Sequence, residues 1–371
     1  MNEVFPPIPA LRLYGAEISY FSAKVRAYLR WKGLPFEEVH ANRDVYRNTL
    51  IPHIGFPVIP VVQTPEGAWL QDSTDIIDAL EVRHPEPSIR PPGAVQQLVA
   101  RLLELLGDEW LLLPAMHYRW HHNRDWAIQA FGALAMPEGS DAEQRSAGER
   151  TAAPFAQAAE LLGAEPAMHQ AVEQAYLGLL DELNTHFEQH PFALGARASV
   201  ADFALYGPLY AHLYRDPASG AIMQHRAPAV VRWIERLSAP PAQPPAAFPD
   251  NDPIPDTLRP ILARQMREQL PDLVETAHRF QTWLVHNPGV PVPRVIGKHA
   301  FQLEGQTGQR ITRPYALWML QRARESYLAT SGNDRARAEQ LLEQVGGAAF
   351  QQFNDPPALR RDGMSVALAT A

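Results

Sequence analysis

The sequence predicts an α/β domain followed by an all-helical domain. Residues 10–95 alternate short apolar runs with amphipathic segments, the pattern of a small mixed sheet carrying helices. From about residue 96 to residue 237 the apolar residues recur at helical spacing, and no convincing strand is visible. Proline clusters at residues 85–92, 239–260 and 288–293 interrupt these patterns and indicate boundaries.

The elements of the first domain follow from short local patterns. Strands are expected at ALRLYG, FEEVHA, VIPVV and AWLQ, with a turn at Pro65, Glu66 and Gly67 before the last. Helices are expected from about Tyr20 to Lys32 and from about Ser73 to His84, with a short irregular helix between them.

Beyond the first domain the pattern is helical with two interruptions. The segments LVARLLELLGDEWLLL, QAVEQAYLGLLDELNTHF and VADFALYGPLYAHLY predict a helical bundle, and the polar stretch 137–150 is expected to be a flexible loop. The proline-rich stretch from Ala239 cannot be helical and is expected to be a linker. After it, residues 257–286 and 314–329 predict helices, 299–313 a small hairpin, and the tail after Gly346 is weakly patterned.

Composition excludes several classes of function. The formal charge of -8 is spread along the chain without a basic stripe, so no nucleic acid is expected as a partner. No apolar run reaches the roughly 18 residues of a membrane span, and the start of the chain lacks the features of a signal peptide. The absence of cysteine excludes disulfides and any mechanism that needs a protein thiolate. We therefore expect a cytoplasmic protein with no membrane partner.

The segment LRLYGAEISYFSAKVRAYLRWKGLPFEEV resembles the N-terminal motif of glutathione transferases. Four further pieces agree with that family in order and spacing: Val58–Val62, Gln71-Asp72-Ser73, LEVRHPEP and LGARASVADFALYG. The resemblance implies a thioredoxin-like, glutathione-binding domain over residues 1–90 and a glutathione transferase-type helical domain over 94–238. Residues 239–371, a Pro-rich linker and a mostly helical extension, lie outside the family pattern.

Ser19 is the candidate catalytic residue. In a thioredoxin-like fold the first helix begins beside the active site, and Ser19-Tyr20-Phe21-Ser22 stands where redox relatives carry Cys-x-x-Cys. Two hydroxyls cannot exchange disulfides, but a hydroxyl can donate to the glutathione thiolate and lower its pKa. The alternative interpretation of Ser19 is a helix N-cap, and Tyr14 and Tyr20 are rival hydroxyls.

The resemblance also implies the residues that bind glutathione as co-substrate. They are the loop residues Tyr20 and Phe21, the Ile59 backbone before a cis Pro60, and the Asp72-Ser73 pair at the γ-glutamyl end. Two of these segments have a structural alternative, because Pro60 suits an edge strand and Asp72 or Ser73 suits a helix N-cap.

One position departs from the family pattern. Many members place Lys, Arg or Gln shortly before the cis-proline to hold the glycine carboxylate, and this chain has Val58 there. The cations that could compensate are Lys24, Arg43, Arg47 and His53, and spacing does not choose among them.

Two other motifs are interpreted as structural. Ser199-Val200-Ala201-Asp202 has the form of a capping box. His117, His121 and Asp125 share one helical face, but without a further clustered ligand we expect no metal site and interpret the face as a cleft wall or dimer face.

The resemblance therefore implies a homodimeric glutathione transferase of the detoxification type, which activates the glutathione thiol for attack on a hydrophobic electrophile. The alternative is a glutathione transferase-like binding or scaffolding protein without turnover. The electrophile and the reaction subtype stay open, because all subtypes need the same activated thiolate.

Overall fold

The structure is a computed structural model that describes residues 10–369. By their contacts these residues form two compact units. The first comprises the described residues up to Ile89, Tyr118–Ala156 and Leu205–Ala246. The second comprises Arg90–His117, Gln157–Ala204 and the described chain from Ala247 onward.

The first unit contains a four-stranded mixed sheet with strand order β2-β1-β3-β4. Its strands are β1 (Leu11–Gly15), β2 (Phe36–His40), β3 (Val61–Gln63) and β4 (Trp69–Gln71). β1 runs parallel to β2 and antiparallel to β3, and β3 runs antiparallel to β4. Leu11 and Leu13 are buried while Arg12 between them is partly exposed, as the alternation of the segment predicts.

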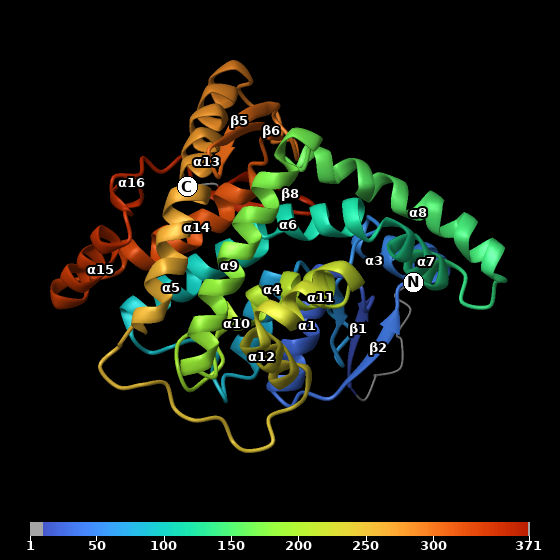
Figure 1. Cartoon of the computed structure of the whole chain (residues 1–371), viewed down its shortest axis with the longest axis horizontal. Helices are drawn as coiled ribbons and strands as arrows, with labels where there is room; N and C mark the ends of the chain where they lie inside the picture. The colour runs from blue at the N-terminus through green and yellow to red at the C-terminus, as the bar shows by residue number, and fades with distance from the viewer. Residues whose placement is uncertain (1–9, 370–371) are drawn as a thin grey trace. The chain divides into compact units, whose positions relative to one another are not determined.

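Helices α1 (Tyr20–Trp31) and α4 (Ser73–Arg83) contact each other within this unit, and α1 also contacts α12 (Pro228–Ser238) (Figure 1). The irregular segment between β2 and β3 consists of α2 (Arg43–Val45), the π-helical turn η1 (Tyr46–Leu50) and α3 (Ile51–Ile54). Further helical elements of this unit include η3 (Tyr118–His122), α7 (Arg124–Ala135), η5 (Leu209–Tyr214) and α11 (Pro217–Arg226).

The prediction of a flexible loop over residues 137–150 is wrong, because helix α8 (Asp141–Leu161) begins inside this stretch. Ser140 donates from its backbone N and its Oγ to Glu143, which starts the helix. Glycines then replace apolar side chains at the contact with α7. A Cβ on Gly148 would lie 2.0 Å from the Ile128 carbonyl oxygen, so the two helix backbones approach too closely for a side chain there. A contact made by backbones has no hydrophobic periodicity.

The second unit is built on α5 (Ala94–Leu105) and on α9 (His169–Gln189). Short helical segments complete this part: η2 (Leu106–Trp110), α6 (Leu112–His117), η4 (Pro166–Met168) and the first residues of α10 (Val200–Pro208). Asp202 accepts hydrogen bonds from the backbone and hydroxyl of Ser199, an interaction that is the acidic half of the predicted capping box.

The extension is an integral part of this second unit. Its long helix α13 (Arg259–His286) follows the turn η6 (Asp256–Leu258), and its helix α14 (Tyr315–Leu328) packs against α5. Gln265 and Gln269 of α13 donate to main-chain carbonyls of α5, at 2.7 Å and 3.0 Å. The extension thus enlarges a helical core.

The proline-rich stretch is not helical, as predicted, since no helix or strand lies between Ser238 and Asp256. Asp252 near its end accepts hydrogen bonds from the backbone N–H groups of Val95 and Gln96, both at 2.8 Å. A linker residue therefore caps the first turn of α5.

The extension also contains two small hairpins. The expected one is β5 (Lys298–Leu303) with β6 (Gln306–Ile311), which lies beside α13 (Figure 1). Its two-residue turn has positive φ at both Glu304 and Gly305, as a tight hairpin requires. The second hairpin, β7 (Leu359–Asp362) with β8 (Ser365–Leu368), follows α15 (Gly332–Gln344) and α16 (Ala348–Gln351), in a tail whose weak pattern did not predict it.

Candidate active site

Three segments singled out by the sequence meet at one edge of the sheet. Tyr14 pairs with Val61, and Val61 pairs with Gln71, so these three residues lie in one row across β1, β3 and β4. Because β3 runs antiparallel to both neighbours, the ends of β1 and β4 lie beside the start of β3. The loop to Ser19, the Ile59–Pro60 bond and the turn at Asp72 therefore share this edge.

The loop between β1 and α1 is held by buried guanidinium groups. Ser19 N donates to the Ala16 carbonyl at 3.0 Å, and Arg26 Nη2 donates to the same carbonyl at 3.1 Å. Arg119 Nη1 donates to the Ile18 carbonyl at 2.8 Å. Arg26 and Arg119 are 1% and 2% exposed, so two buried guanidinium groups hold the main-chain carbonyls of this loop in place.

Glu17, the side chain between these two carbonyls, is also engaged. Its carboxylate accepts a hydrogen bond from Tyr210 Oη and forms an ion pair with Arg215 Nη1 at 2.9 Å. Arg26 Nη1 lies 3.4 Å from its second oxygen. Burial raises the pKa of Tyr210, which keeps that phenol protonated and able to donate.

Ser19 is the N-cap residue of α1. Its Oγ accepts from Ser22 N at 3.3 Å and from Ser22 Oγ at 2.9 Å. Ser19 therefore acts as the helix N-cap. Because its oxygen only accepts in these two bonds, its hydroxyl proton can still be donated to another acceptor.

The two rival tyrosines have other surroundings. Tyr14 is buried, donates from its hydroxyl to Gln63 at 3.2 Å and stacks on Trp69. Burial raises the pKa of the Tyr14 phenol. The Tyr20 ring is buried, close to the Phe21 ring and in a T-shaped contact with the His212 ring. The Tyr14 side chain therefore packs within the sheet.

The two further segments expected to bind glutathione have the local structure that the resemblance implies. The Ile59–Pro60 peptide bond is cis. Asp72 has a φ of 78° and caps α4, accepting from the backbone N of Thr74 at 2.9 Å and of Asp75 at 3.4 Å. Ser73, the first residue of α4, is buried.

The four cations that could compensate for the missing charge at Val58 differ in burial. Lys24 is fully buried and donates to Thr74 Oγ1 at 3.1 Å, so it supports the first turn of α4 from inside. Arg43, Arg47 and His53 are exposed. The His53 ring stacks on Trp69 with centroids 4.2 Å apart, which places it beside β4.

His117, His121 and Asp125, which share one helical face in the sequence, differ in their surroundings. His117 is buried in the second unit and lies 2.9 Å from Glu173 Oε1. In the first unit His121 and Asp125 are exposed, and Asp125 pairs with Arg145 at 3.3 Å.

Sequence reasoning missed Arg26 and Arg119 as supports of the loop. Arg26 lies in the N-terminal segment that carries the family resemblance, and that was a usable signal. Arg119 lies 101 positions from Ile18, and no local pattern connects the two.

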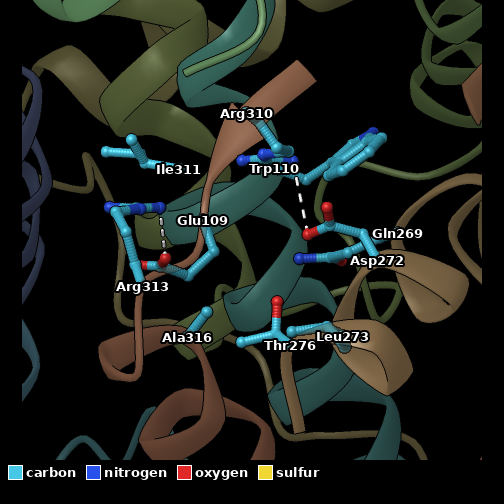
Figure 2. Close-up of a pocket in the computed structure, with 10 residues that line it drawn as sticks. All are labelled: Glu109, Trp110, Gln269, Asp272, Leu273, Thr276, Arg310, Ile311, Arg313 and Ala316. Atoms are coloured by element: carbon cyan, nitrogen blue, oxygen red, sulfur yellow. Dashed lines mark hydrogen bonds and ion pairs between the residues drawn. The ribbon is translucent and has the colours of Figure 1, made fainter. Parts of the chain in front are cut away.

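A separate recess lies within the second unit, between η2, α13, β6 and the start of α14 (Figure 2). Its empty volume is about 280 Å³, including space open to solvent. Arg313 donates to Glu109 at 2.6 Å, and Arg310 lies 3.4 Å from Asp272. The charges of these four side chains cancel, so we interpret the recess as a structural junction of the extension.

Asp272 is the centre of that junction. It also lies 2.8 Å from His299 Nε2. Burial by itself would raise the pKa of Asp272, but Arg310 and the His299 hydrogen bond outweigh it and hold that pKa below its usual value. Asp272 is thus held as the carboxylate that binds β5 and β6 to α13.

Comparison with protein families decides the identity of the two domains. The model of the glutathione S-transferase N-terminal domain matches residues 13–88, and the model of the glutathione S-transferase C-terminal domain matches residues 153–236. The chain belongs to the glutathione transferase superfamily. The predicted fold class is confirmed: a thioredoxin-like domain with a four-stranded sheet, followed by a glutathione transferase-type helical domain.

Solved structures similar to this transferase-superfamily chain match about two thirds of it. A beta-etherase from Sphingobium sp. strain SYK-6 has 21% sequence identity and a TM-score of 0.46, over 63% of this chain and 96% of its own. A glutathione S-transferase from Methylobacterium radiotolerans in complex with glutathione sulfonate has 24% identity and a TM-score of 0.39, over 63% and 96%. A GST-like protein from Pseudomonas syringae has 19% identity and a TM-score of 0.42, over 67% and 80%.

Among curated proteins, no sequence matches this superfamily member. Within residues 10–369, none of its helices combines the length and the apolar character that crossing a bilayer needs.

Proposed function

We propose that this protein is a glutathione transferase that activates the glutathione thiol for attack on a hydrophobic electrophile. The observation that carries the proposal is the meeting of the Ser19 loop, Ile59–Pro60 and Asp72-Ser73 at one sheet edge. Glutathione would lie along that edge with its sulfur at the N-terminus of α1, where unpaired N–H groups and the helix dipole favour a thiolate.

In this proposal Ser19 is the catalytic residue. Its hydroxyl donates a hydrogen bond to the thiolate and lowers the pKa of the bound thiol. Tyr20 and Phe21 line the loop, the Ile59 backbone beside Pro60 pairs with the peptide part of glutathione, and Asp72-Ser73 receive the γ-glutamyl end.

The test is Ser19→Ala. Loss of a hydrogen bond to a charged acceptor costs about 1.5 to 3 kcal/mol, so turnover should fall tenfold or more when thiolate formation limits the rate. Ultraviolet titration should show the bound thiol's pKa moving upward, while glutathione affinity changes less. If titration and rate stay at wild-type values, Ser19 is not the activator.

The alternative function is glutathione transferase-like binding or scaffolding without turnover. Val58 favours it, since no cation stands at the position where many family members hold the glycine carboxylate. Calorimetry at millimolar glutathione, followed by a survey of electrophiles, separates the two. Binding without turnover supports the alternative, and no binding defeats both forms of the proposal.

Three further properties belong to the proposal. The glutathione-binding domain would span residues 1–90, the helical domain 94–238, and the extension 239–371. The protein would be a cytoplasmic homodimer. Sedimentation at micromolar concentration showing only a 41.4 kDa species would remove the dimer.

A further inference from the structure

Ser22, the fourth residue of Ser19-Tyr20-Phe21-Ser22, is a buried hydroxyl directed at the proposed catalytic one. It is 0% exposed, although it lies in the first turn of α1. Its Oγ donates to Ser19 Oγ at 2.9 Å, and its backbone N donates to the same atom at 3.3 Å. Solvent therefore does not compete for the Ser22 hydroxyl.

These two donations determine what Ser19 can do. A hydroxyl oxygen has two acceptor lone pairs and one proton. Both hydrogen bonds from Ser22 end on the Ser19 oxygen, so the Ser19 proton cannot be directed back to Ser22. Within residues 10–369 no protein acceptor for that proton is seen. The proton is available at the N-terminus of α1.

The Ser22 side chain lies against the Gly15 backbone, where the absence of a Cβ leaves room for it. A Cβ on Gly15 would lie 3.0 Å from Ser22 Oγ and 3.1 Å from Ser22 Cβ. The Ser22 hydroxyl thus lies between the end of β1 and Ser19, to which it is hydrogen-bonded. The Ala16 and Ile18 carbonyls, held by Arg26 and Arg119, fix the loop that brings Ser19 to it.

We propose that Ser22 is a positioning residue for thiol activation: its hydroxyl orients the Ser19 hydroxyl and polarises it, so that Ser19 donates more strongly to the glutathione thiolate. The inference rests on the proposed function of Ser19. No proton is transferred between the two serines. Ser22 O–H donates to Ser19 O, and Ser19 O–H donates to the sulfur, so each hydrogen bond strengthens the next.

The experiment compares Ser22→Ala with wild type and with Ser19→Ala in the full chain. Ser22→Ala should raise the pKa of bound glutathione in ultraviolet titration and lower turnover roughly two- to fivefold, because cooperative polarisation is a fraction of one hydrogen bond. The KM for glutathione should change little. Ser238→Ala, which removes a partly buried hydroxyl on α12 that is bonded to Tyr206, is the matched control and should leave the thiol pKa unchanged.

A double-mutant cycle then decides whether Ser22 acts through Ser19. In the Ser19→Ala background, Ser22→Ala should have no further effect on rate or thiol pKa. An equal effect in both backgrounds would mean a general structural role and overturn the inference. Wild-type values for Ser22→Ala beside an impaired Ser19→Ala would also overturn it.

The Ser19→Ala result separates failure of the proposed function from failure of this inference. If Ser19→Ala is itself fully active, the proposed role of Ser19 fails first, and the inference fails with it. If Ser22→Ala does not fold, Ser22→Thr retains the hydroxyl on the same Cβ. Ser22→Thr should keep the wild-type thiol pKa, and a raised pKa in the folded, hydroxyl-bearing variant would count against the inference.

Discussion

Arg119 offers a sharp test of the forces that hold the first unit together. All five of its N–H groups are used within that unit. Nε and Nη2 donate to Asp216 at 2.8 Å and 2.7 Å, and Nη2 also donates to the Ala211 carbonyl at 2.7 Å. Nη1 donates to the Ile18 carbonyl and lies 2.8 Å from His212 Nε2. Because arginine carries no acceptor, His212 must accept there, as a neutral ring with its proton on Nδ1.

Arg119→Met should be strongly destabilising. Asp216 is 0% exposed, so the substitution leaves a buried carboxylate without its cation and several buried acceptors without their donors. Breaking a buried ion pair from one side costs about 3 to 5 kcal/mol, whereas replacing both partners by apolar residues is often close to neutral. Arg119→Met combined with Asp216→Leu should therefore recover a large part of the loss.

Urea denaturation followed by circular dichroism measures both variants, with Arg124→Met as the control. Arg124 is exposed in the neighbouring helix α7, and its replacement should stay within about 0.5 kcal/mol of wild type. A loss of less than about 1 kcal/mol for Arg119→Met would refute the reasoning, and so would a double variant less stable than the single one.

Three further predictions concern packing, pH and the extension. Gly148→Ala should destabilise the protein by about 1 to 3 kcal/mol, because its Cβ would meet the Ile128 carbonyl oxygen at 2.0 Å in the α7–α8 contact. A thermal unfolding midpoint equal to that of wild type would contradict this. Burial lowers the pKa of His186 to about 4, so its neutral form stabilises the fold above pH 6.5, and this stability is lost as pH falls from about 6.5 to 4. His186→Gln should remove on the order of 3 kcal/mol of that dependence, measured as the difference in unfolding free energy at pH 7 and pH 4. A chain ending at Ala246 should lose the folded second unit, because α5 packs on α14 and α13; circular dichroism and limited proteolysis would show this, and a protease-resistant α5 would contradict it.

Much of the fold could be predicted because its signals are local. Leu11, Arg12 and Leu13 alternate as a half-buried strand must, and the prolines of the linker exclude a helix wherever they stand. The start of α1 at Tyr20 was predicted within one residue because a serine precedes an apolar run. The spacing of Ser199 and Asp202, three residues apart, likewise predicted that the two side chains interact at the start of a helix.

The failures have a common physical cause. Residues 141–150 are polar and small, and their helix packs through glycine backbones instead of apolar side chains, so periodicity could not reveal it. The tail hairpin β7–β8 is made of short strands that derive their stability from the unit in which they lie, including their contacts with α14.

The sequence by itself determined the chemistry at the candidate site: a chain without cysteine, with Ser19 at the start of a helix and a proline after Ile59, has hydroxyls and backbone groups to offer a thiol. Only the tertiary structure decided which of these groups face one another. The antiparallel register brings the Ser19 loop, Pro60 and Asp72 to one edge of the sheet. Arg119 reaches the Ile18 carbonyl across 101 positions of chain. Hydroxyl chemistry belongs to single residues, whereas a buried guanidinium acquires its role only when folding surrounds it with acceptors that no neighbouring residue supplies.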